Sequence, residues 1–177
     1  APRSTPYTLP GISGIGIGRS IAAAPLRGCV VAPLARLSCW GANAFGQLGD
    51  GTTDTRLSPV EVRDIAVTRV ATGPVHTCAI LSDRTMRCWG RNANGQVGDA
   101  STMDRSRPTE VMGITTATDV CAGDGHSCAR LADATVRCWG RNTEGQLGDG
   151  TLTDRATPTA VPGLERITSV SCGAFHT

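Results

Sequence analysis

The chain contains no lysine, few aromatic residues and no long hydrophobic segment. All 17 basic side chains are arginines, and with 15 acidic residues the net charge is only +2, so no basic surface predicts nucleic-acid binding. No apolar run approaches the roughly 20 residues that a membrane-spanning helix needs. The 22 glycines and 10 prolines instead indicate many turns between short strands, as in an all-β protein.

One motif recurs three times, at steps of 49 and then 50 residues. Its pattern is Cys-Trp-Gly-x-Asn-x-x-Gly-Gln-Leu/Val-Gly-Asp, and it occupies Cys39–Asp50, Cys88–Asp99 and Cys138–Asp149. A step of this length suits one four-stranded sheet per repeat. We therefore predict an all-β fold, a partial β-propeller of about three blades, each a four-stranded antiparallel sheet.

Other landmarks divide the chain in the same register. An Arg-x-x-Pro segment recurs late in the repeats and again at Arg3–Pro6, so residues 1–20 are expected to be the tail of a preceding repeat plus a glycine-rich connector, not a leader peptide. The pattern is also interrupted after Thr177, and we expect a window from a longer array or an oligomer that completes the sheet. The predicted repeats are 21–66, 67–115 and 116–165, and residues 166–177 begin a fourth.

Six of the eight cysteines form three pairs, and the two members of each pair are 10 residues apart. In the second and third pairs the intervening residues are turns centred on Asp83 and Asp133, which predict β-hairpins. Cysteines opposed across such a hairpin are within reach of a disulfide. Zinc binding is the alternative, but it usually draws two ligands from a Cys-x2-Cys or Cys-x4-Cys segment, which the chain lacks. The predicted disulfides join Cys29 to Cys39, Cys78 to Cys88, and Cys128 to Cys138.

The other two cysteines, Cys121 and Cys172, fall in equivalent strands of successive repeats but are offset by one residue. Side-chain alternation then points them to opposite faces of those strands. We therefore favour two buried thiols, with a bridge between neighbouring blades as the alternative. Disulfides in series imply an oxidising compartment, so the expected location is extracellular, periplasmic or on the cell surface.

The remaining constant residues are interpreted as structural. We expect the tryptophans to fill the space between adjacent sheets, the glycines to turn the backbone with positive φ, and the histidines to bond backbone atoms. Three alternatives are disfavoured: phosphate binding at Gly46–Gly51, because no helix follows it; calcium binding by the aspartates, because the oxygen ligands are too sparse; and a ring of histidines around a metal. We predict no metal and no cofactor. The structural residues are Trp40, Trp89, Trp139, Gly46, Gly95, Gly145, His76, His126 and His176.

The ordered segments Val-Ala-x-Gly-x-x-His-Thr-Cys-Ala, Cys-Trp-Gly-x-Asn-x-x-Gly-Gln-Leu-Gly-Asp and Arg-x-x-Pro resemble the repeat of the regulator of chromosome condensation family. The resemblance covers Arg3 to Thr177. It implies a propeller, commonly of seven blades, and the cysteine-bearing form looks like exported bacterial members. Members of that family include an exchange factor for a small nuclear GTPase, which the paired cysteines disfavour here, and exported inhibitors of β-lactamases.

No nucleophile, general base and orienting acid occur together outside the repeats, so we expect no catalytic residues and no enzyme activity. The expected function is that of a secreted or surface propeller that binds proteins through loops that vary between repeats. The alternatives are a building block of an extracellular fibre or surface assembly, joined through open sheet edges, and an inhibitor or lectin-like binder with its site in further repeats. The expected partner is another protein or further copies of the chain, with no nucleic acid and no membrane span.

Overall fold

The structure is a computed structural model that describes residues 20–177. Nearly all of the predicted tail and connector, residues 1–19, lies outside this part. Between residues 20 and 177 the chain forms twelve β-strands and one short 3-10 turn, η1 (Pro33–Ala35). No helix in the described part is long and apolar enough to cross a membrane.

The strands form three separate four-stranded sheets, and every pair of neighbouring strands is antiparallel. We call the sheets blade 1, blade 2 and blade 3. Blade 1 contains β1 (Ser20–Ala24), β2 (Arg27–Val31), β3 (Leu37–Gly41) and β4 (Arg56–Val62). Blade 2 contains β5 (Val67–Thr72), β6 (His76–Leu81), β7 (Met86–Gly90) and β8 (Arg105–Glu110). Blade 3 contains β9 (Ala117–Ala122), β10 (His126–Leu131), β11 (Val136–Gly140) and β12 (Arg155–Ala160). The predicted all-β fold, with one four-stranded antiparallel sheet per repeat, is confirmed.

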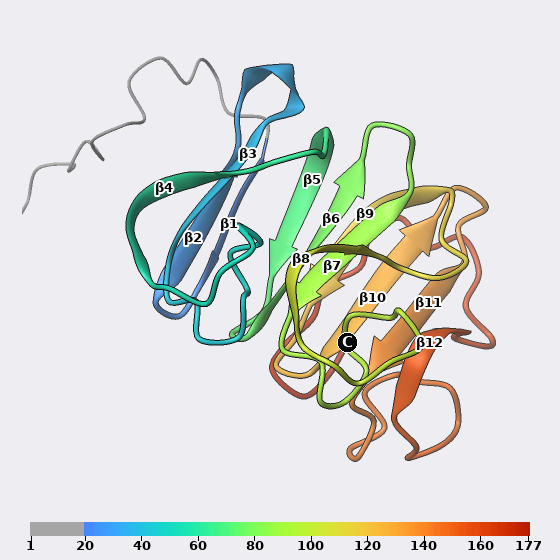
Figure 1. The fold of residues 1–177 in the computed structure, drawn as a ribbon. Coiled ribbons are helices and arrows are strands. Elements are labelled where there is room, and N and C mark those ends of the chain that lie inside the picture. The colour runs from blue at the N-terminus through green and yellow to red at the C-terminus, as the bar shows by residue number, and fades with distance from the viewer. Residues whose placement is uncertain (1–19) are drawn as a thin grey trace, which may run out of the picture.

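The blades follow one another in chain order, like adjacent sectors of a propeller (Figure 1). The first strands of successive blades lie next to one another, since β1 contacts β5 and β5 contacts β9. Within each blade the chain then moves outward strand by strand, so the fourth strands β4, β8 and β12 are the outermost. Neighbouring sheets therefore meet face to face, and the hydrophobic core lies between blades.

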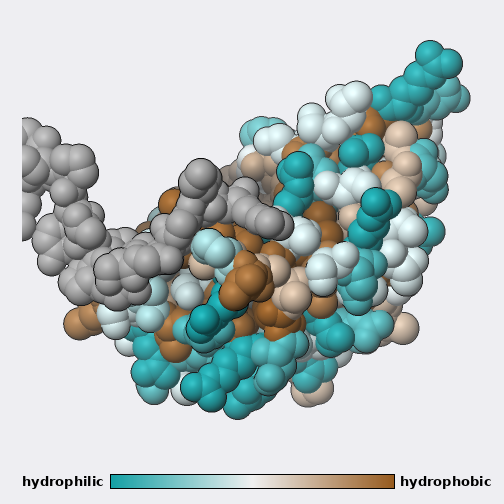
Figure 2. All heavy atoms as spheres, turned by 90° about the horizontal axis from the view of Figure 1, so that it is seen from above, coloured by the Kyte–Doolittle hydropathy of each residue, from teal (hydrophilic) through white to brown (hydrophobic). Residues whose placement is uncertain are grey.

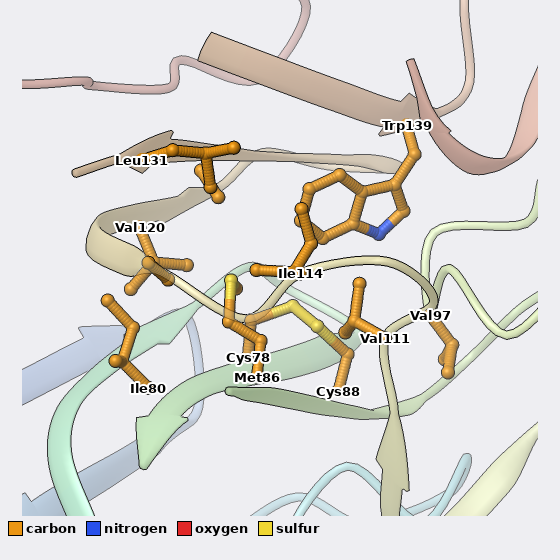
Figure 3. Packing of buried hydrophobic residues seen from close by; sticks show 12 residues of the cluster. Cys78, Ile80, Met86, Cys88, Val97, Val111, Ile114, Val120, Leu131 and Trp139 are labelled. Atoms are coloured by element: carbon orange, nitrogen blue, oxygen red, sulfur yellow. A yellow bond between two sulfur atoms is a disulfide. The ribbon is translucent and has the colours of Figure 1, made fainter. Parts of the chain in front are cut away.

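The core between blades 2 and 3 shows how two sheets pack (Figure 3). Trp139 on β11 points from blade 3 toward blade 2, where Met86 and the Cys78–Cys88 disulfide lie across from it. The core between blades 1 and 2 repeats this arrangement with Trp89, which packs with Leu48 and Val62 of blade 1. Two large buried indoles thus join three sheets.

The beginning of the fourth repeat lies against blade 3 without forming a strand. The backbone N–H of Asp124 donates to the carbonyl of Ala174 at 3.1 Å, and the N–H of Val170 donates to the Asp119 carboxylate at 3.2 Å.

Figure 2 shows the molecule from the end at which the β2–β3 turn lies. Hydrophobic residues gather toward the middle of that view, and hydrophilic residues lie along its edge.

Candidate interaction surface

The three predicted hairpin disulfides are present. In each blade the second and third strands place the two cysteines directly opposite each other in register, with Cα atoms 4.1 Å apart. The turn in blade 2 is held by Asp83, whose carboxylate accepts from the backbone N–H and the hydroxyl of Thr85 at 2.9 and 2.7 Å. Asp133 and Thr135 repeat these bonds in blade 3. In blades 2 and 3 the Asp-centred turn supports the register that brings the sulfur atoms together, and in blade 1 the turn at Pro33–Ala35 gives the same register.

The favoured interpretation of Cys121 and Cys172 as free thiols is wrong, because the two form a fourth disulfide. The one-residue offset does place the two side chains on opposite faces of equivalent segments, β9 for Cys121 and the start of the fourth repeat for Cys172. In a propeller, however, opposite faces of successive sheets are the ones that meet, so this offset is what a bridge between blades requires. Cys121 belongs to blade 3 and Cys172 to the start of the fourth repeat, and the described residues contain no free cysteine.

Each inter-blade tryptophan is held by the Gly-Gln-Leu/Val-Gly segment of the preceding blade. The Nε1 of Trp89 donates to the carbonyl of Gln47 at 3.0 Å, and the Nε1 of Trp139 donates to the carbonyl of Gln96 at 2.9 Å. Trp40 differs, since it is only half-buried and its ring lies over Gly28 of its own hairpin. Trp89 and Trp139 thus occupy the predicted position between sheets, whereas the described residues contain no sheet before blade 1 against which Trp40 could pack.

The histidines also connect blades, but not through backbone atoms as expected. The Nε2 of His76 bonds the hydroxyl of Ser127 at 2.9 Å, and the Nε2 of His126 bonds the hydroxyl of Thr177 at 3.1 Å. Burial is the main cause that lowers the pKa of His76 to about 3, so this imidazole is neutral at neutral pH. The third histidine, His176, is exposed.

Arg27 is a structural residue that the sequence reasoning did not single out. It stands in blade 1 at the position of His76, and the alignment of the two hairpins was the available signal. Its buried guanidinium donates to the carbonyl of Gln47 at 2.9 Å, to the hydroxyl of Thr77 and to the carbonyls of Gly73 and His76. Burial lowers its pKa to about 10, so Arg27 remains charged and joins blade 1 to blade 2.

The loops between third and fourth strands share a constant polar framework. In blade 3 the Asn142 side chain donates to Asp149 at 3.0 Å, and the N–H of Leu147 donates back to the Asn142 side-chain oxygen. The other oxygen of Asp149 accepts from Arg155 at 2.9 Å. The hydrogen bond from Thr151, aided by Arg155, lowers the pKa of Asp149 to about 2. Blades 1 and 2 repeat these bonds, so the carboxylates of Asp50, Asp99 and Asp149 are each engaged within their own loop.

The predicted turn glycines lie in this framework, and all three have positive φ: 75° at Gly46, 81° at Gly95 and 75° at Gly145. The first two also allow close contact with the next blade. A Cβ on Gly46 would lie 2.4 Å from the Cα of Ser106 on β8, and one on Gly95 would lie 2.5 Å from the Cα of Ala156 on β12. These glycines are therefore structural in two ways.

The same loops lie at one end of the propeller with the turns between first and second strands. Three backbone hydrogen bonds connect the two sets: Ala42 N–H to the Leu26 carbonyl, Arg91 N–H to the Val75 carbonyl, and Arg141 N–H to the Gly125 carbonyl. We call this end the loop face. Its framework is constant, but the tips differ between repeats, as at the equivalent positions Phe45, Asn94 and Glu144.

Large apolar side chains protrude from the loop face. Leu26 is 84% exposed, Met103 63%, Leu152 68% and Phe175 52%. Two arginines stack on aromatic rings there, with Arg91 5.2 Å from the centre of Phe45 and Arg141 5.4 Å from that of Phe175. Arginine, methionine and aromatic residues are the types that protein–protein interfaces enrich. The loop face is thus a rigid framework with variable, partly apolar tips.

Comparison with solved structures shows the same fold in several propellers. Human WBSCR16 matches with a TM-score of 0.78 at 20% identity, over 89% of this chain and 43% of that one. Prp20p from Saccharomyces cerevisiae matches with a TM-score of 0.70 at 22% identity, over 81% and 38% of the two chains. Yeast RCC1 (Prp20) bound to Kap60 matches with a TM-score of 0.75 at 22% identity, over 87% and 40%. The chain thus spans about two fifths of the length of these structures.

A search of curated proteins gave no significant match. The profile of the regulator of chromosome condensation (RCC1) repeat matches residues 36–80, 88–130 and 133–177. A second profile of the same repeat matches residues 67–96 and 117–146. The first profile alone accounts for most of the chain, and the structural neighbours include yeast RCC1 itself. The chain therefore belongs to the regulator of chromosome condensation (RCC1) repeat family.

Proposed function

We propose that this chain is part of an exported propeller that binds a protein partner through the loop face and catalyses no reaction. The observation that carries the proposal is the contrast between the constant loop framework and its variable, exposed tips. A framework held by repeated Asn–Asp–Arg bonds keeps the tips in fixed positions. Preorganised loops lose little conformational freedom on binding, which favours affinity.

Relatives of the same fold support a binding role. Prp20p has binding properties to Gsp1p and histones, and yeast RCC1 binds Kap60. These partners are proteins, and they belong to those propellers. We carry over only the class of partner, which is a protein. Nucleic acid is not proposed as a partner, because a net charge of +2 does not favour binding to it.

The exposed apolar residues of the loop face stand at positions that do not follow the repeat. Met103 stands where the other blades have Asp54 and Thr153, so neither its size nor its exposure serves a structural need shared by all blades. Exposed apolar side chains that gather on one surface commonly mark binding sites, and Leu26, Met103, Leu152 and Phe175 all project from the loop face.

Export is supported by the cysteines. All eight are paired, and three of the four pairs are repeated at equivalent positions of the blades. Disulfides in such a series persist in oxidising compartments and are rare in the cytosol. We therefore propose that the protein resides outside the cytoplasm, at the cell surface, in the periplasm or in the medium.

Site-specific photocrosslinking tests the binding face. A photoreactive residue is introduced at Met103, at Leu152 and, as the matched control, at Leu34, which is 88% exposed but lies in the β2–β3 turn at the opposite end. The full-length protein is then irradiated in the cells that produce it. We expect one discrete crosslinked protein from Met103 and Leu152 and none from Leu34.

Equal yields at all three positions would indicate non-specific contact, and a product from Leu34 alone would place the partner on the opposite end. Either result overturns the assignment of the loop face. A crosslink to a second copy of the chain at Met103 would identify self-association and favour the structural building block instead.

A further inference from the structure

Three arginines from two blades line one cavity at the junction of blades 1 and 2. The cavity has a volume of about 230 Å³, and the loop at Gly49–Asp50 forms part of its wall. Arg87 lies on β7 and Arg107 on β8 of blade 2, and Arg63 directly follows β4 of blade 1. We call this the arginine cavity. Its guanidinium groups come from segments far apart in the sequence.

These arginines lack the partners that other arginines of the blades have. Arg63 and Arg107 form no ion pair and no side-chain hydrogen bond with any residue between 20 and 177. The Nη2 of Arg87 lies 4.0 Å from Glu110, beyond hydrogen-bond distance, and its buried Nε has no partner within the same residues. By contrast, an aspartate lies 2.7–2.9 Å from each of Arg56, Arg105 and Arg155. The arginine cavity therefore offers charged donors that nothing in the described chain satisfies.

The two acidic residues of the cavity do not neutralise these donors. Both oxygens of Asp50 are engaged in its own loop, where Oδ1 accepts from the Thr52 hydroxyl at 2.8 Å and Oδ2 accepts from Arg56 at 2.7 Å. Asp64 is exposed and, among residues 20–177, forms no ion pair with the arginines beside it. Three guanidinium groups thus face one free carboxylate, and the cavity has an excess of positive charge.

The repeat does not account for this cluster. In the corresponding place between blades 2 and 3, only one of the three positions is an arginine. The positions equivalent to Arg63, Arg87 and Arg107 hold, in that order, Met112, Arg137 and Thr157. Since blades 2 and 3 pack without the other two arginines, their presence between blades 1 and 2 serves something other than packing.

The loop backbone of blade 1 makes room for one of these side chains. A Cβ on Gly51 would lie 2.5 Å from the Nη2 of Arg107, so the guanidinium packs directly against the loop. The next loop has Ala100 in place of this glycine, and it has Thr157 in place of the arginine. The glycine and the long charged side chain therefore occur together at the first junction and are both missing from the second.

We propose that the arginine cavity binds a phosphate group, either as inorganic phosphate or as the phosphate monoester end of a larger molecule. A planar guanidinium group can donate two parallel N–H bonds to such an oxyanion. Three guanidinium groups match the three terminal oxygens of a phosphate monoester, whereas a carboxylate offers only two oxygens. No apolar tip of the loop face lines this cavity, so the site stands independently of the proposed function.

An NMR titration of the isotope-labelled full chain tests the site and locates it. The probes are sodium phosphate and phenyl phosphate, and sodium chloride at matched ionic strength is the control. We expect saturable amide shifts around Gly49, Arg87 and Arg107 with phosphate and none with chloride. Saturation by phenyl phosphate as well identifies a monoester site, and saturation by inorganic phosphate alone identifies a site for the free ion. Both outcomes support the proposal.

Two arginine variants and a matched control separate the cavity from general charge. Arg107→Gln and Arg87→Gln each remove one guanidinium group from the cavity. Arg137→Gln removes the same charge at the position equivalent to Arg87, in the next blade. We expect the first two variants to bind phosphate at least about tenfold more weakly, as loss of a hydrogen bond between charged groups does, and Arg137→Gln to bind as the unmodified chain does.

Three results would overturn the proposal. They are an absence of saturable shifts with both phosphate probes, shifts of the same size and place with chloride, and an equal loss of affinity in Arg137→Gln. The amide spectrum also shows directly whether each variant folds. If Arg87→Gln does not fold, Arg107→Gln decides, since its side chain is exposed and makes no hydrogen bond within the described residues.

Discussion

Replacing Trp89 by alanine is expected to lower the free energy of unfolding by about 3–5 kcal/mol, the range observed for large-to-small changes in a core. The indole is fully buried between blades 1 and 2, where it packs with Leu48 and Val62 and donates to the Gln47 carbonyl. The substitution removes this packing and leaves a buried carbonyl with one donor fewer. Urea unfolding followed by circular dichroism measures the change.

Trp40→Ala is the matched control, since Trp40 has the same sequence neighbours but is only half-buried and makes no hydrogen bond through Nε1 within the described residues. We expect its effect to be clearly smaller than that of Trp89→Ala. A loss of less than about 1 kcal/mol for Trp89→Ala would contradict the account of blades joined by buried indoles.

Removal of the bridge between Cys121 and Cys172 is expected to cost more than removal of any hairpin bridge. Loop-closure entropy grows with the length of the loop, so the separation of 51 residues corresponds to about 4 kcal/mol, against about 2.5–3 kcal/mol for a separation of 10 residues. Urea unfolding of the full chain with Cys121→Ala and Cys172→Ala, compared with Cys29→Ala and Cys39→Ala, tests this order.

The inter-blade bridge also has a local consequence. Because residues 166–177 form no strand, they depend on this bridge and a few hydrogen bonds to stay against blade 3. Hydrogen exchange at the Asp124 amide should therefore rise in the Cys121/Cys172 variant and not in the hairpin variant. Unchanged exchange together with a smaller loss of stability than in the hairpin variant would contradict the role given to this bridge.

The repeat made most of the fold predictable from sequence. A 10-residue spacing between cysteines, with an Asp-centred turn between them in blades 2 and 3, predicts a hairpin register, and the register predicts the disulfide. The step of 49 to 50 residues likewise indicates four strands per sheet. Both inferences depend on contacts within one repeat, where sequence spacing translates directly into distance.

Contacts between repeats were harder to predict. The sequence indicated that the side chains of Cys121 and Cys172 point to opposite faces of equivalent segments. Whether the two cysteines can form a bridge depends on which faces of neighbouring sheets meet, and the sequence does not show this. The partners of His76 and His126 are hydroxyl groups about 50 residues further along the chain, a relationship that no local pattern reveals. Arg27 replaces a histidine and makes comparable inter-blade bonds by different chemistry, so a search for constant residues passes over it.

The central proposal is that this disulfide-bonded propeller belongs to an oxidising compartment. Non-reducing peptide mapping of the protein, isolated from its own cells with free thiols blocked at lysis, tests it most directly. The account predicts recovery of four linked pairs in the exported fraction, Cys29–Cys39, Cys78–Cys88, Cys128–Cys138 and Cys121–Cys172. Blocked free thiols at the six hairpin cysteines, in protein recovered from the cytoplasm, would contradict it.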